Sequence, residues 1–368
     1  MSNPDTPLLS LIRARISDEG PMSLSDYMTM ALDHPEFGYY RTQDPFGAKG
    51  DFVTAPDISQ VFGELLGLWL ATAWVEAGKP SPFRLVELGP GRGQLLVDLI
   101  RATTNVPGFL DAADLHLVES SDKLRDVQRQ ALGDLSIHWH DRLEDVPSGP
   151  LYLIGNEFLD ALPIHQLIKT TNAWDERLVG LDDDGTLCYT SAPALPELIS
   201  LIVGGDEAAF GTIAEISFSR TRLSEMLGRR LAEDGGVALL IDYGAWVDRP
   251  TGDTLQAVSR HQPIDPLSMP GLADITAQVD FRAIGQAAGE GGAAIYGPVP
   301  QGTFLRTLGI EPRIAMLLKE ADEDQRQALR GALFRLTDAS AMGEVFKVLV
   351  LAPPEAPCPP GFVPPALG

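Results

Sequence analysis

A short glycine-rich run, Glu87-Leu-Gly-Pro-Gly-Arg-Gly93, constrains the fold of this chain more than any other segment. It follows the apolar run 84–88, which predicts a strand, and it precedes the helical pattern 94–102. Glycines at such a junction can adopt positive φ and let the main chain approach a ligand. Free N–H groups at the start of the helix add partial positive charge. The segment therefore predicts a strand–loop–helix unit that binds a ligand at its turn. An ordinary strand-to-helix turn is the alternative.

Strands and helices alternate from Phe83 onward, which indicates a mostly parallel sheet with crossover helices. The fold class that we predict is α/β, a Rossmann-like sheet with helices on both faces. A helical N-terminal region and inserted antiparallel and loop segments accompany this sheet. The predicted strands of the sheet are 84–88, 114–119, 135–140, 151–154, 237–241 and 346–351, with helices over 94–102 and 121–132.

The same patterns divide the chain into a core interrupted by insertions. The tail is rich in proline, which predicts an extended or disordered end. The predicted segments are a helical N-terminal region (1–80), the first half of the core (81–165), an insertion with antiparallel strands and helices (166–235), a core strand (236–249), a covering insertion of Gly- and Pro-rich loops (250–300), the C-terminal part of the core (301–352) and the tail (353–368).

The spacing of the glycines distinguishes two kinds of nucleoside site. Dinucleotide sites prefer G-x-G-x-x-G, whereas this loop has G-x-G-x-G with Glu87 two residues before the first glycine. S-adenosylmethionine has no pyrophosphate, but the ammonium group of its amino-acid end needs an acidic or carbonyl partner. Glu87 can meet that need directly or through water. The loop therefore predicts S-adenosylmethionine as cofactor, bound by Gly89, Pro90, Gly91 and Gly93.

Two further acids follow the next two strands. Glu119 closes the second strand, where a carboxylate can accept hydrogen bonds from both ribose hydroxyls. Asp141 follows the third strand and is placed to accept from the adenine amino group, with a solvated loop acid as the alternative. Acids at the ends of three successive strands strengthen the prediction of a nucleoside cofactor.

The side of the methyl acceptor is expected after the fourth strand, because ligands of open α/β sheets lie beyond the carboxyl ends of the strands. Asn156 and Glu157 come at that point, and Asp160 shares a helical face with Glu157 if a helical turn begins there. Carboxylates hold a guanidinium bidentately, so Glu157 is the first candidate to bind an arginine and Asp160 the second. Helix capping is the alternative for Asn156 and Glu157. His261 is a candidate proton relay, although a lone loop histidine is more often structural.

The formal net charge of −23 makes nucleic acid a poor partner and favours a basic peptide, with solubility as the alternative explanation. No apolar run is long enough to span a bilayer, so membrane insertion is not expected. Cys188 and Cys358 have no metal-ligand spacing, and His138 and His140 have no further ligands beside them, so no metal is expected. The first 20 residues resemble neither a signal peptide nor an organelle presequence, which predicts a cytoplasmic protein. The oligomeric state stays open.

With these residues assembled, the chain resembles the MidA family of class I methyltransferases, which comprises mitochondrial complex I assembly factors and their bacterial relatives. The resemblance runs nearly end to end, and its most particular segments are Asn156-Glu-Phe-Leu-Asp-Ala-Leu-Pro163 and Asp274-Ile-Thr-Ala-Gln-Val-Asp-Phe281. It implies protein arginine methylation, in the form of symmetric dimethylation of the quinone-side subunit of NADH dehydrogenase. The positions that match the cofactor motif of the family are Gly89, Gly91, Gly93 and Glu119. Because the mitochondrial members need a targeting sequence, which the first 20 residues do not resemble, the resemblance implies a bacterial cytoplasmic member.

Two other functions stay open at this point. One is methylation of a small molecule, which would need a closed pocket rather than an open acidic cleft. The other is a non-catalytic assembly chaperone on a methyltransferase fold, although the glycine loop and Glu119 are intact. A dehydrogenase is disfavoured by the spacing of the glycines.

Overall fold

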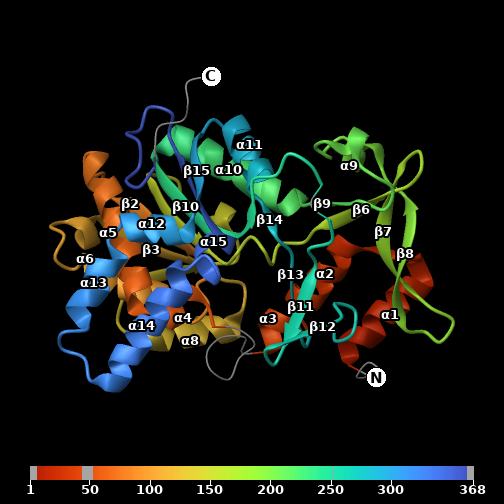
Figure 1. The fold of residues 1–368 in the computed structure, drawn as a ribbon, viewed down its shortest axis with the longest axis horizontal. Coiled ribbons are helices and arrows are strands. Elements are labelled where there is room, and N and C mark those ends of the chain that lie inside the picture. The colour runs from red at the N-terminus through yellow and green to blue at the C-terminus, as the bar shows by residue number, and fades with distance from the viewer. Residues whose placement is uncertain (1–5, 44–52, 251, 363–368) are drawn as a thin grey trace. The chain divides into compact units, whose positions relative to one another are not determined.

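The computed structural model describes residues 6–43, 53–250 and 252–362, and the chain forms two compact units (Figure 1). Each unit is assembled from three separate stretches of the chain. Unit 1 comprises Met1–Phe52, Asp160–Arg222 and Trp246–Arg282. Unit 2 comprises Val53–Leu159, Leu223–Ala245 and Ala283–Gly368. The helices of the N-terminal region 1–80 thus fall in both units.

The strands of unit 2 form one sheet in the order β15-β16-β10-β5-β2-β3-β4. Their bounds are β2 (Phe83–Leu88), β3 (Ala113–Val118), β4 (Ile137–His140), β5 (Leu151–Asn156), β10 (Gly236–Ala245), β15 (Ala294–Pro300) and β16 (Phe346–Ala352). The strands from β4 to β10 are parallel to their neighbours, whereas β16 is antiparallel to β10 and to β15. The order in which the chain visits the strands reverses between β2 and β5, and such a reversal creates a ligand crevice at the carboxyl ends of the strands.

Two helices of unit 2, α5 (Gln60–Glu76) and α6 (Gln94–Thr103), pack closely on each other. They share an apolar core with side chains of β2, β5 and β10. Gly67 of α5 allows this approach, since a Cβ there would lie 2.9 Å from Cα of Leu99 on α6. A larger residue at position 67 would therefore separate the two helices. Because α6 begins at the glycine loop, this packing also fixes where the loop ends.

The remaining helices of unit 2 flank the sheet, and several of them come from the C-terminal part of the chain (Figure 1). Arg313 of α13 forms an ion pair with Glu64 of α5, with an N–O distance of 2.8 Å, and this pair connects the C-terminal helices to α5. The helices of unit 2 other than α5 and α6 are α4 (Ala55–Ile58), α7 (Phe109–Ala112), α8 (Asp122–Leu132), α12 (Gln301–Thr307), α13 (Ile310–Leu317), α14 (Glu323–Thr337) and α15 (Met342–Val345), together with most of α10 (Phe218–Asp234) and α11 (Phe281–Glu290).

Unit 1 combines helices with two small antiparallel sheets. One sheet has the order β1-β7-β6-β9, with β8 also paired to β7, and the other has the order β12-β11-β13. Its helices are α1 (Pro7–Glu19), α2 (Leu24–Asp33), α3 (Tyr39–Thr42) and α9 (Pro196–Ile199), and its strands are β1 (Met22–Ser23), β6 (His165–Lys169), β7 (Trp174–Leu181), β8 (Leu187–Pro193), β9 (Ile213–Ile216), β11 (Gln256–Ser259), β12 (Gln262–Ile264) and β13 (Asp274–Thr276).

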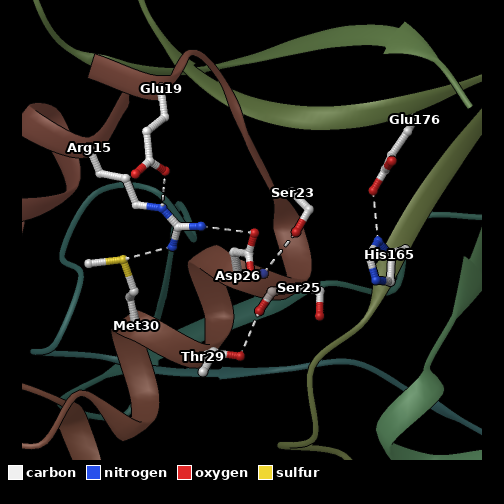
Figure 2. A network of polar contacts seen from close by, with 9 residues as sticks. All are labelled: Arg15, Glu19, Ser23, Ser25, Asp26, Thr29, Met30, His165 and Glu176. Atoms are coloured by element: carbon white, nitrogen blue, oxygen red, sulfur yellow. Dashed lines mark hydrogen bonds and ion pairs between the residues drawn. The ribbon is translucent and has the colours of Figure 1, made fainter. Parts of the chain in front are cut away.

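Polar contacts at the surface of unit 1 connect α1 to α2 (Figure 2). Arg15 of α1 lies 3.2 Å from Glu19 and 3.2 Å from Asp26 of α2. Exposed ion pairs of this kind contribute little to stability. The two helices are therefore held mainly by their buried apolar side chains, which include Ile12 and Tyr27. Figure 2 also shows His165 of β6 bonded across the sheet to Glu176 of β7, at 2.7 Å.

The six core strands predicted from the sequence are present, with ends that differ by at most two residues except for β10, which runs four residues beyond its predicted end, and the α/β fold class is confirmed. The antiparallel strands expected in the insertion 166–235 are present and include β6, β7 and β8. The segment 250–300, which we expected to form a covering insertion, also contributes β15, and this strand pairs with β16 in the main sheet. A Pro-containing edge strand gave little periodic signal. The tail has no helix or strand over 353–362, and residues 363–368 lie outside the described residues.

Candidate active site

The glycine loop lies directly after β2, at the point where the strand order reverses. Gly89, Gly91 and Gly93 have φ values of +59°, +52° and +81°, a region that residues with a side chain rarely adopt. Space is also restricted, since a Cβ at Gly89 would lie 2.8 Å from the ring of Phe158. The loop is closed by a hydrogen bond of 2.7 Å from the N–H of Gly93 to the carbonyl of Pro90. Both backbone conformation and close approach therefore require glycine here.

Glu87 compensates for the missing cap of α6. Gly93 stands at the N-cap and has no side chain, and the buried Glu87 carboxylate accepts a hydrogen bond from the N–H of Leu96 instead. Burial raises the pKa of Glu87 to about 8, against the opposing effect of that hydrogen bond. Its Oε2 atom is buried and has no hydrogen-bond partner among the described residues. A buried carboxylate with one unused oxygen is suited to binding a cationic group.

Glu119 follows β3 and is buried, with an exposed fraction of 7%. Its Oε1 accepts a hydrogen bond of 2.8 Å from the N–H of Ser121, the N-cap of α8. Its Oε2 lies 3.3 Å from Nε2 of Gln128, which also donates to the carbonyl of Gly91 at 2.8 Å. Gln128 of α8 thus joins Glu119 to the glycine loop. Gln128 was not among the residues predicted from the sequence, although its polar side chain on the apolar face of α8 was a signal.

Asp141 follows β4, and the structure brings it near Glu119 through Arg125 of α8. Arg125 donates to the carbonyl of Glu119 at 2.7 Å from Nε and forms an ion pair of 2.7 Å with Asp141. The Asp141 side chain is 70% exposed, so this ion pair is solvated. Asp141 is therefore exposed to solvent, whereas Glu119 is buried.

Asn156 and Glu157 come at the carboxyl end of β5, as predicted. Glu157 has a φ of +51°, which is uncommon for a residue with a side chain. Its Oε1 accepts hydrogen bonds from the N–H of Ala55 at 3.1 Å and from Nδ2 of Asn156 at 3.2 Å. Oδ1 of Asn156 is buried and has no hydrogen-bond partner within the described ranges. Strained backbone that its surroundings hold in place often marks a functional position.

Asp160 and His261 belong to unit 1, whereas Glu157 belongs to unit 2. The helical turn that would place Glu157 and Asp160 on one face does not form. Residues 157–162 form bends and turns instead, and the positive φ of Glu157 is incompatible with a helix. The Asp160 carboxylate accepts the N–H of Ala161 at 2.9 Å. His261 is exposed in the turn between β11 and β12, with a φ of +60°.

Asp242 of β10 has a structural role next to Glu157. It is fully buried, and its two oxygens accept the N–H groups of Leu159 and Tyr243, each at 2.9 Å. This fastens the segment after β5 to β10 and helps to hold Glu157 in place.

The parallel pairing of β3 and β4 adds a third histidine to His138 and His140. Nδ1 of His116 lies 2.9 Å from Nε2 of His140, and burial lowers the pKa of His116 to about 4. The third ring was not expected from the sequence, because His116 lies on a different strand. Among the described residues, no group of three or more histidine, cysteine or acidic side chains is arranged to hold a metal ion. No helix in the described part of the chain is long and apolar enough to cross a membrane.

The strand order, the glycine loop at its reversal point and the buried acid after β3 define the class of nucleoside-binding α/β proteins. A family of S-adenosyl-L-methionine-dependent methyltransferases matches residues 65–299. The chain belongs to this family, the MidA family that the sequence resembles, and S-adenosylmethionine is its cofactor.

Similar proteins cover nearly the whole chain. The zebrafish protein arginine methyltransferase NDUFAF7, mitochondrial (Danio rerio), is 38% identical over 365 residues, which are 92% of this chain and 85% of the relative. The human protein of the same name (Homo sapiens) is 36% identical over 378 residues, which are 95% and 84% of the two chains. A crystal structure of a Burkholderia thailandensis protein bound to S-adenosyl-homocysteine has a TM-score of 0.82 and 31% identity, over 96% of this chain and 95% of the other.

Proposed function

We propose that this protein transfers a methyl group from S-adenosylmethionine to an arginine side chain of a partner protein. The observation that carries the proposal is the carboxylate of Glu157, fixed at the carboxyl edge of the sheet by the N–H of Ala55 and the amide of Asn156. Support comes from the relatives named protein arginine methyltransferases, which match over nearly the whole chain. The net charge of −23 suits a basic substrate.

The residues around the glycine loop fit the cofactor. The unused oxygen of the buried Glu87 suits the ammonium group of its amino-acid end. The positive φ values of the glycines keep the loop free of side chains where the cofactor approaches. Glu119 would accept hydrogen bonds from the ribose hydroxyls. Asp141, paired with Arg125, would lie beside the adenine. When bound, the cofactor supplies an electrophilic methyl group on a sulfonium.

On the acceptor side, the chemical difficulty is that a guanidinium is a weak nucleophile, because its lone pairs are delocalised. Glu157 would accept two N–H groups of the guanidinium, which orients one nitrogen and draws positive charge away from it. The unpartnered Oδ1 of Asn156 would accept a third N–H. The proton lost from the methylated nitrogen would pass to Glu157 or to water. Asp160 and His261 stay predictions, since no contact adds support for them.

The finer proposal is symmetric dimethylation of a complex I subunit, the quinone-side subunit, with one methyl group on each terminal nitrogen. It is tested by incubating the purified protein with isotope-labelled S-adenosylmethionine and that subunit from cells lacking this gene. Mass spectrometry should find one and then two added methyl groups on arginine. Labelling of small molecules only would favour a small-molecule methyltransferase, and cofactor binding without any transfer would favour an assembly chaperone. The cytoplasmic location stays a prediction, because the relatives are named as mitochondrial.

We expect cofactor binding to release a proton from Glu87. With a pKa raised to about 8, the free protein holds about 0.9 of a proton there at pH 7. An ammonium group beside the carboxylate favours its charged form, so the proton leaves on binding and affinity rises with pH until about pH 8. Calorimetric titration of S-adenosylhomocysteine in buffers of different ionisation enthalpy measures the release directly.

The control for this prediction is Glu87→Gln, whose amide oxygen can still accept the N–H of Leu96. The variant should bind without proton release and with little pH dependence. The raised pKa also implies that the free energy of unfolding falls as pH rises from 4.5 to about 8, because the folded state holds the proton more tightly, and the variant should lose this slope. Equal proton release in the variant and the wild type would assign the titration to another group.

A further inference from the structure

Gln128 is the fully buried polar residue on which three parts of the cofactor site converge. Its Nε2 donates to the carbonyl of Gly91 at 2.8 Å and lies 3.3 Å from Oε2 of Glu119. Its Oε1 accepts the indole N–H of Trp139, on β4, at 2.8 Å. The amide therefore contacts the glycine loop, the carboxylate after β3 and the edge strand of the sheet at once.

These three bonds allow only one orientation of the amide. An amide has two N–H donors on nitrogen and lone pairs on oxygen, whereas the indole of Trp139 can only donate. The oxygen of Gln128 must therefore face Trp139, and both N–H groups are left for the two acceptors, Gly91 and Glu119. Arg129, whose guanidinium carbon lies 4.9 Å from the Trp139 ring centroid, packs over the indole and helps to hold it.

The same bonds fix the direction of the Glu119 carboxylate. One oxygen receives the N–H of Ser121 at 2.8 Å, and the other faces Gln128, so the carboxylate has donors on both of its oxygens. A carboxylate oxygen can accept more than one hydrogen bond, so these donors do not exclude a ligand hydroxyl. Without Gln128, Oε2 of Glu119 would lose the donor that faces it, and the buried Gly91 carbonyl would lose the hydrogen bond from Nε2.

We propose that Gln128 is the positioning residue for ribose recognition: it aims Glu119 at the sugar and couples that carboxylate to the conformation of the glycine loop. This inference rests on the proposed cofactor site and adds to it a residue that lies outside the glycine loop and the strand ends. Its consequence is specific to the hydroxyl groups of the ribose. Loss of Gln128 should therefore weaken recognition of those hydroxyls more than it weakens contacts to the rest of the cofactor.

The test compares S-adenosylhomocysteine with its 2′-deoxyribose analogue by calorimetric titration. In the wild type, loss of the hydroxyl should weaken binding about tenfold or more, as expected for a hydrogen bond to a carboxylate. In Gln128→Met, which keeps the length of the side chain but has no amide, the two ligands should bind almost equally. A merely structural role of Gln128 would weaken both ligands by the same factor, so an unchanged ratio in the variant would overturn the inference.

Three further variants complete the test. Gln128→Glu places a carboxylate oxygen against the Gly91 carbonyl and Glu119, so it should bind S-adenosylhomocysteine more weakly than Gln128→Met. Gln130→Met, at an exposed position on the same helix, should behave like the wild type. Trp139→Phe removes only the N–H that orients the amide of Gln128. The affinity ratio between S-adenosylhomocysteine and its 2′-deoxyribose analogue should therefore fall to a value between those of the wild type and Gln128→Met. If Gln128→Met does not fold, this ratio in Trp139→Phe tests the inference instead. A wild type with no hydroxyl effect would instead contradict the role of Glu119 in the proposed function.

Discussion

Gly91→Val is expected to abolish binding of S-adenosylhomocysteine while the protein stays folded. Gly91 has a φ of +52°, and a β-branched residue there costs about 1–3 kcal/mol in backbone strain. Relief of that strain would turn the carbonyl that accepts the hydrogen bond from Gln128, so the loop would lose its shape at the position where the cofactor approaches. Calorimetric titration measures the affinity, and thermal unfolding shows whether the fold is retained.

The matched control is Gly133→Val at the end of α8. Gly133 also has a positive φ, +61°, and a Cβ there would meet no atom within 4 Å. Its valine variant should suffer a comparable loss of stability and keep wild-type affinity for the cofactor. If both variants lost affinity together, the loss would reflect strain in the fold rather than the glycine loop. Wild-type affinity in Gly91→Val would contradict the assignment of the cofactor site.

Glu157→Gln is expected to lower the rate of methyl transfer by about a hundredfold or more and to leave cofactor affinity unchanged. Glutamine is isosteric, and its Oε1 can still accept the hydrogen bonds of Ala55 and Asn156. The stability of the fold should therefore change little. What is lost is the negative charge that holds the guanidinium and polarises it. Single-turnover transfer to an arginine-containing substrate, measured at saturating cofactor, isolates this effect.

Two comparisons make this prediction specific. Asp160→Asn removes the charge of a carboxylate that lies in unit 1. Comparison of its transfer rate with that of Glu157→Gln shows which of the two carboxylates contributes more to methyl transfer. Glu157→Gly relieves the positive φ of +51° but removes the acceptor of the Ala55 N–H, so it should be inactive irrespective of its stability. Transfer at the wild-type rate in Glu157→Gln would show that the carboxylate does not hold the acceptor.

The features that could be predicted from the sequence are those that depend on neighbouring residues. The apolar runs of the core strands, the positive-φ glycines after β2 and the acids at the strand ends are local patterns. Parallel strands also place their carboxyl ends at one edge of the sheet, so the proximity of Glu119 and Asp141 followed from the fold class. The sequence therefore determined the α/β class, the glycine loop after β2 and the sheet edge at which the strand-end acids gather.

The tertiary structure alone decided the contacts between residues far apart in the chain. The side chain of Gln128 donates a hydrogen bond to the carbonyl of Gly91, which lies 37 residues away in the sequence. The N–H of Ala55 donates to the carboxylate of Glu157, which lies 102 residues away. The pairing of β15 with β16 and the separation of Asp160 from Glu157 into different units likewise have no local signature. The physical reason is that a buried hydrogen bond is specified by which donor and acceptor the packing of the whole unit brings together, whereas strand and loop propensities are set by adjacent residues.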